Sequence, residues 1–175
     1  FYIGAINDDD NVAAGANDLD DAVTAGYDFQ ISLNTSFTGE DSFDVTIDAG
    51  QIGANGVSEF GGDDTNDALN VDGIAYTFPL GDKTTVMVGD NNDGSSLFTT
   101  ACVYGGPSDT LDDCGAGNAN FGNGGAMVAA SYDFGTGLTA AVGYAGGEAS
   151  LATEEGEDDW GMNLAYTGDN YGISA

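Results

Sequence analysis

The sequence predicts an all-β protein, built as an antiparallel β-barrel or as a contiguous fragment of a larger barrel of about 16 strands. Three observations support this prediction. Apolar residues recur at every second position through most of the chain, helical spacing of apolar residues appears nowhere, and short connections alternate with long ones. We expect the 175 residues to form a single domain or barrel segment.

The alternation begins most clearly between Tyr27 and Phe37, where odd positions are apolar, even positions are polar, and only Thr35 blurs the pattern. A run with this period fits a strand and not a helix. Similar runs follow to the end of the chain. With the opening run, they give nine predicted strands: 1–4, 27–37, 43–49, 74–80, 86–88, 128–134, 138–144, 160–166 and one that begins at 171.

The connections between these strands also follow a pattern. Tight, glycine-bearing turns are predicted at 38–41, 81–82, 135–136 and 168–169, and long acidic connections at 8–21, 51–70, 90–125 and 146–158. Short and long alternate strictly, provided that the apolar run Leu97–Tyr104 is not a strand of the ladder. Transmembrane barrels show this alternation, whereas a β-sandwich has no reason to place all its short turns at one end.

The composition of the two strand faces favours a membrane. The polar face carries small and acidic residues, whereas soluble strands usually carry basic side chains on the solvent face and at edges. The apolar face places aromatic residues near strand ends, where aromatic girdles lie in membrane barrels. These residues are Tyr27, Phe37, Tyr132, Phe134, Tyr144, Trp160, Tyr166 and Tyr171. The alternative is that they form the core of a secreted acidic β-sandwich or β-solenoid that binds calcium at a cell surface.

Charge narrows the classes of function. Thirty acidic residues face a single base, Lys83, and there is no histidine, so the formal net charge is −29. Nucleic acid is a poor partner for such a chain, while cations are attracted to it. We expect no enzyme, because acid–base catalysis at neutral pH would depend on carboxylates alone. No apolar run is long enough for a transmembrane helix, and the chain opens in a strand, as a piece of a longer exported protein would.

Two hairpins resemble those of cyanobacterial outer-membrane porins. Asn34–Asp41 reads Asn-Thr-Ser-Phe-Thr-Gly-Glu-Asp, precedes a strand that ends in Ala49-Gly50, and is similar to the Thr-Ser-Phe-Thr-Gly-acidic hairpin of that family. Asp133–Leu138 reads Asp-Phe-Gly-Thr-Gly-Leu and is similar to a second turn typical of it. The similarity in hairpin rhythm covers most of the chain.

The resemblance implies a large barrel in the outer membrane that passes inorganic ions and small nutrients, with iron uptake sometimes proposed. Porins are often trimers, so we expect a homo-oligomer in contact with outer-membrane lipid. Members usually carry an N-terminal surface-layer-homology domain and a coiled coil. These 175 residues match neither, so the resemblance assigns no anchoring role to this stretch.

The polar faces of the two strands at 27–37 and 43–49 are predicted to line a water-filled pore. Carboxylates crowded on one face repel each other unless water or cations screen them, which a wet lumen provides. The predicted pore-lining residues are Asp28, Gln30, Ser32, Asn34, Asp44, Thr46 and Asp48. On the opposite face, we predict that Phe29, Ile31, Leu33, Phe43, Val45 and Ile47 point away from the lumen. Rings of carboxylates in a pore favour cations.

The longest connection, 90–125, contains both cysteines, Cys102 and Cys114. A disulfide between them is the favoured interpretation, since an exported protein folds in an oxidising compartment. The apolar side chains in Leu97–Tyr104 could pack this connection against another part of the protein. We expect it either to fold into the pore as a constriction or to pack across the mouth, the alternative being an external hairpin.

No cofactor is predicted. Ca²⁺ or Mg²⁺, which take oxygen ligands, could bind loosely at acidic loops, although none of these loops has the spacing of a calcium-binding loop. The candidate ligands are Asp8, Asp9, Asp10, Asp90 and Asp93. Solvated acidic loops are the alternative interpretation of these runs.

Overall fold

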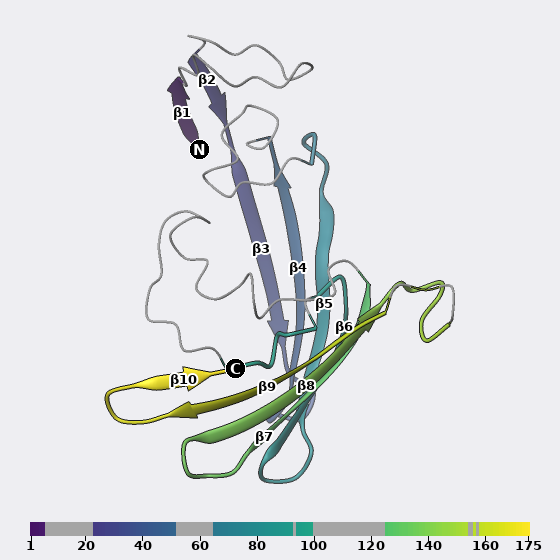
Figure 1. The fold of residues 1–175 in the computed structure, drawn as a ribbon. Coiled ribbons are helices and arrows are strands. Elements are labelled where there is room, and N and C mark those ends of the chain that lie inside the picture. Colours follow the sequence, from purple (N-terminus) through teal and green to yellow (C-terminus); the bar gives the residue numbers. More distant parts are fainter. Residues whose placement is uncertain (6–22, 52–64, 93, 100–124, 154–155, 157) are drawn as a thin grey trace. The chain divides into compact units, whose positions relative to one another are not determined.

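The structure is a computed structural model that describes residues 1–5, 23–51, 65–92, 94–99, 125–153, 156 and 158–175 (Figure 1). These residues contain ten strands and no helix, which confirms the all-β prediction. The strands are β1 (Tyr2–Ala5), β2 (Val23–Gly26), β3 (Asp28–Thr35), β4 (Ser42–Gly50), β5 (Asn70–Pro79), β6 (Thr84–Asp90), β7 (Ala126–Asp133), β8 (Leu138–Gly146), β9 (Asp158–Thr167) and β10 (Gly172–Ser174).

One strand was not predicted. β2 pairs antiparallel with β1, from Val23 opposite Ala5 to Gly26 opposite Tyr2, and Tyr27 alone separates it from β3. The segment Val23–Gly26 is short and contains alanine and glycine, which have weak strand preference. Its strand conformation depends on the pairing with β1, which lies far away in the sequence.

Eight strands form one open antiparallel sheet in the order β10-β9-β8-β7-β6-β5-β4-β3. Every pair of neighbours in this sheet is also consecutive in the chain. The two edges of the sheet are β10 and β3, and β1 and β2 form a separate two-stranded sheet. The described residues belong to two compact units, one made from parts of 1–31 and 47–70, the other from parts of 32–46, 71–99 and 125–175. The expectation of a single domain stays a prediction.

The four predicted short turns are confirmed by the strand bounds, whereas each predicted long connection includes residues outside the described part of the chain. Residues 36–41, 80–83, 134–137 and 168–171 form the short turns. The strict alternation of short and long connections stays a prediction. Gly39, Gly81 and Gly135 adopt positive φ angles of 88°, 76° and 79°, a conformation that favours glycine and reverses the chain in three of the short turns. The described part of the run Leu97–Tyr104, residues 97–99, lies outside the strands, as the alternation requires.

The turn between β3 and β4 is organised around the carboxylate of Asp41. Its Oδ1 atom accepts hydrogen bonds from the backbone amides of Phe37 and Thr38, at 3.0 and 2.9 Å, and from the hydroxyl of Ser36 at 2.5 Å. Its Oδ2 atom accepts one from the Tyr76 hydroxyl on β5, at 2.7 Å. The side chain is only 9 % exposed. The hydroxyl of Ser36, then that of Tyr76, then the Thr38 amide hold the pKa of Asp41 well below its usual range.

We predict that Asp41→Asn loosens this turn and that the wild-type turn loosens in acid. Because the folded-state pKa of Asp41 is lowered, its stabilising effect is present above the unfolded pKa of about 4 and is lost as the pH falls below that value. At pH 7 the Phe37 and Thr38 amides should exchange hydrogen roughly tenfold faster in Asp41→Asn. The protection factors of these two amides, measured at pH 7 and at pH 3, check both statements. An Asp41→Asn turn as protected as the wild type at pH 7 would contradict them.

Candidate functional site

Unbroken strand pairing from β5 to β9 gives the sheet two distinct faces. Tyr76 lies opposite Val88, Val88 opposite Val128, Val128 opposite Tyr144, and Tyr144 opposite Trp160. Successive side chains of a strand point to opposite faces, so each such row fixes the face of its neighbours. The apolar face contains this row and the next, which is Phe78, Val86, Ala130, Val142 and Met162.

The apolar face is exposed. On β9, Trp160, Met162 and Leu164 share this face and are 69 %, 68 % and 54 % exposed. The same holds on the neighbouring strands, where Val88, Val128 and Val142 are also exposed. Water-soluble monomers rarely expose a contiguous apolar surface of this kind.

Aromatic side chains gather on this face near the short turns. The rings of Phe37 and Tyr76 lie 6.0 Å apart, and those of Tyr132 and Phe134 lie 4.8 Å apart. Further along the sheet the Tyr166 and Tyr171 rings lie 5.8 Å apart. At the other end of the same face, Tyr144 and Trp160 are cross-strand neighbours. On β7, β8 and β9 the aromatic residues therefore form two groups, one toward each end of the strands.

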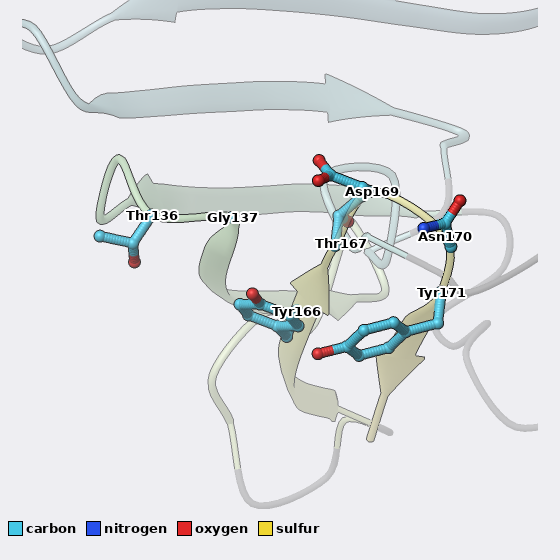
Figure 2. A pocket seen from close by; sticks show the side chains of 8 residues that line it. Thr136, Gly137, Tyr166, Thr167, Asp169, Asn170 and Tyr171 are labelled. Atoms are coloured by element: carbon cyan, nitrogen blue, oxygen red, sulfur yellow. The ribbon is translucent and has the colours of Figure 1, made fainter.

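A cavity of about 540 Å³ lies between the β7–β8 and β9–β10 turns. Figure 2 shows the two tyrosine rings beside each other and the side chains of Asp169 and Asn170 pointing away from them. The cavity is open and polar, and its lining residues are Thr136, Gly137, Tyr166, Thr167, Gly168, Asp169, Asn170 and Tyr171. It lies at the short-turn end, among the aromatic residues of that end.

The opposite face, called the small-residue face below, is made mostly of small residues and is partly covered by residues 94–99. Leu97 packs against a buried cluster on this face. The cluster consists of Ala75, Met87, Met127, Ala129 and Ala145. The Thr99 amide donates a hydrogen bond to Oδ1 of Asn163, at 3.1 Å, and the Thr139 hydroxyl donates one to Thr99 Oγ1, at 3.2 Å. Of the long connection, the described part thus lies on the face opposite the exposed apolar one.

The residues predicted to line a pore lie on β3 and β4, but they differ in their partners. Both oxygens of Asp44 accept hydrogen bonds, Oδ1 from the side-chain Nδ2 of Asn34 and Oδ2 from the Ser42 hydroxyl. Ser32 and Gln30 are exposed, and Thr46 is half-buried. Gln30 is not without an interaction partner. Asp28 and Asp48 each bury one oxygen, Oδ1, that accepts no hydrogen bond from the described residues. Whether these seven residues line a pore stays a prediction.

The residues predicted to point away from the lumen are partly exposed. Phe29, Ile31 and Leu33 on β3 are exposed, while Phe43, Val45 and Ile47 on β4 are half-buried. The Phe37 ring lies 5.9 Å from that of Phe43 and 6.0 Å from that of Tyr76. These contacts connect the apolar side of the β3–β4 hairpin to the apolar face of β5.

Several predicted residues lie outside the described part of the chain. They are Cys102 and Cys114 of the predicted disulfide, and Asp8, Asp9, Asp10 and Asp93 of the weak metal candidates. Asp90 is described, is exposed, and ends β6 opposite Ile74. Within the described ranges, no three acidic, cysteine or histidine side chains gather closely enough to hold a metal ion.

The sequence prediction missed the residues of β7, β8 and β9 on the small-residue face. Asn163 is the clearest case, because it is 7 % exposed and binds both Thr99 and, through its Nδ2 atom, the carbonyl oxygen of Ala175 at 3.5 Å. The signal was available, since Asn163 stands between Met162 and Leu164 in an alternating strand. The prediction considered only the apolar residues of that strand and not the polar residues between them.

Comparison with protein-family models, with curated proteins and with solved structures found no match. The resemblance to cyanobacterial porins therefore stays a prediction. In the part of the chain that the structure describes, no helix is long and apolar enough to cross a membrane.

We predict that Asn163→Ala releases the segment 94–99 from the small-residue face. The variant removes the acceptor of the Thr99 amide, so this amide should exchange hydrogen roughly tenfold faster. Met162→Ala is the matched control, because Met162 is adjacent in sequence but lies on the other face, and it should leave Thr99 unchanged. Equal exchange rates in Asn163→Ala and the wild type would show that other contacts hold the segment.

Proposed function

We propose that this chain forms part of the wall of a porin-type β-barrel in the outer membrane. The barrel passes small hydrophilic solutes and inorganic ions, prefers cations, and assembles as a homo-oligomer, as porin trimers do. The observation that carries the proposal is the exposed apolar face of β5–β9 opposite a face of small and polar residues.

The physical argument begins with the apolar face. In the alternative, a soluble acidic β-sandwich, Trp160, Met162 and Leu164 would pack under a second sheet, yet they are exposed. Contact with lipid tails explains their exposure, and aromatic groups at both ends match the girdles of membrane barrels. β5, β8 and β9 contain 10, 9 and 10 residues, close to the roughly 9–11 of a tilted membrane-spanning strand.

Closure of the barrel follows from the backbone. The edge strands β3 and β10 carry amide and carbonyl groups on their outer sides, and such groups must be paired inside a bilayer. The open sheet would therefore be one contiguous part of a larger barrel, closed by further strands. An even number of strands is usual in bacterial single-chain barrels.

The small-residue face would then be the lumen, and residues 94–99 would lie inside it. Their packing against the wall through Leu97 and Asn163 supports a constriction rather than an external hairpin. The only base of the chain, Lys83, sits in a short turn and donates to the carbonyl oxygen of Phe134 at 3.4 Å. A lumen lined by this chain contains carboxylates without opposing bases, which favours cations.

We predict that lysine is costly on one face of β7 and tolerated on the other. Ala130→Lys places a charge on the apolar face, at a cost of about 2–4 kcal/mol near the bilayer midplane, whereas Ser131→Lys places it toward the lumen. Trp160, the only tryptophan, reports insertion through quenching by brominated lipids. Ala130→Lys should reduce the quenched, folded fraction in liposomes and Ser131→Lys should not. Equal loss in both variants would contradict the assignment of the faces.

We further predict that the full-length protein conducts cations in preference to anions. In a planar bilayer under a KCl gradient, the sign of the reversal potential should show that K⁺ permeates more readily than Cl⁻. A preference for Cl⁻ would contradict the selectivity. A protein that inserts but carries no current would overturn the porin itself.

A further inference from the structure

Two carboxylates on β3 and β4 each bury one oxygen that has no hydrogen-bond donor among the described residues. Asp48 is 6 % exposed, and its Oδ1 atom accepts no hydrogen bond from any described residue. The same is true of Oδ1 of Asp28, whose side chain is half-buried. A buried carboxylate oxygen without a hydrogen-bond donor is energetically costly, so a bound partner would stabilise each of these atoms.

The strand pairing brings these two carboxylates to one face. The amide of Gln51 donates to the carbonyl oxygen of Tyr27 at 2.9 Å, which places Gly50 beside Asp28 and Asp48 beside Gln30 in an antiparallel pair. Asp28 and Asp48 are then diagonal neighbours on the same side of the two strands. Diagonal neighbours lie about 7–8 Å apart, a separation that a cation between two carboxylate oxygens can bridge.

Asp44, the third acid that the sequence places on this face, has a different environment. Its two oxygens are occupied by Asn34 and Ser42. Asp41, in the turn, is likewise surrounded by donors. The described residues of the hairpin therefore supply donors to Asp41 and Asp44 and leave one oxygen each of Asp28 and Asp48 for another partner.

We propose that Asp28 and Asp48 together bind a divalent cation of the Mg²⁺ or Ca²⁺ class. Hard cations take oxygen ligands, and Mg²⁺ commonly binds through one or two carboxylates while keeping several waters. Only one base in the chain, Lys83, could compete with a cation for these carboxylates. The inference rests on the proposed function, since it gives the pore wall a binding step for a permeating cation.

Calorimetric titration of the full-length protein in detergent with CaCl₂ and, separately, MgCl₂ tests the site without requiring a current. We expect a dissociation constant on the order of a millimolar or lower for at least one of these ions. Asp28→Asn and Asp48→Asn should each weaken binding by at least about tenfold, because each removes one of two charged ligands. Asp169→Asn removes the same charge from an exposed turn and should leave the affinity unchanged. Asp48→Glu keeps the carboxylate and should retain binding if Asp48→Asn fails to fold.

The outcomes separate the site from general charge screening. No binding of either ion to the wild type overturns the proposal. So does Asp44→Asn weakening binding as much as Asp48→Asn, since diffuse attraction would not distinguish the two acids. Planar-bilayer conductance distinguishes failure of the proposed cation site from failure of the proposed porin function. Binding by a protein that carries no current keeps the site and overturns the proposed function, whereas K⁺ conduction without divalent binding overturns the site alone.

Discussion

The unbroken antiparallel pairing from β5 to β9 is the constraint on which the rest of the structure depends. Because side chains alternate between faces, the pairing of Val88 with Val128 and of Tyr144 with Trp160 fixes the face of every other residue in these strands. A slip of one residue in any strand would move its apolar side chains among the small ones. The separation of the exposed apolar face from the small-residue face follows directly from this pairing.

That separation decides where the longest connection can pack. Residues 94–99 meet the sheet where Leu97 packs against a buried cluster of alanines and methionines and where Asn163 offers an acceptor. The segment and the apolar surface are therefore on opposite sides of one sheet. In a barrel this arrangement places the segment inside and the apolar residues in lipid.

Four aspartates of β3, β4 and the turn between them fall into two groups that net charge does not distinguish. Asp41 is held by hydroxyl and amide donors, so its charge organises a turn and its pKa is lowered. Asp44 is similarly occupied, whereas Asp28 and Asp48 each keep a buried oxygen without a donor. The first group stabilises the hairpin and needs no ion. The second group gains a partner only from outside the described residues, and a cation is the partner that the charge of the chain would concentrate.

The sequence by itself determined the all-β class, most strand positions and the four short turns, because a period of two and turn-forming glycines are local signals. It missed β2, whose strand conformation depends on β1, and it overlooked Asn163. Only the tertiary structure decided that residues 94–99 lie on the small-residue face and which acids have donors. Asp41, for example, receives the Tyr76 hydroxyl from 35 residues away. Such contacts join residues that are distant in the sequence, and only the folded sheet brings them together.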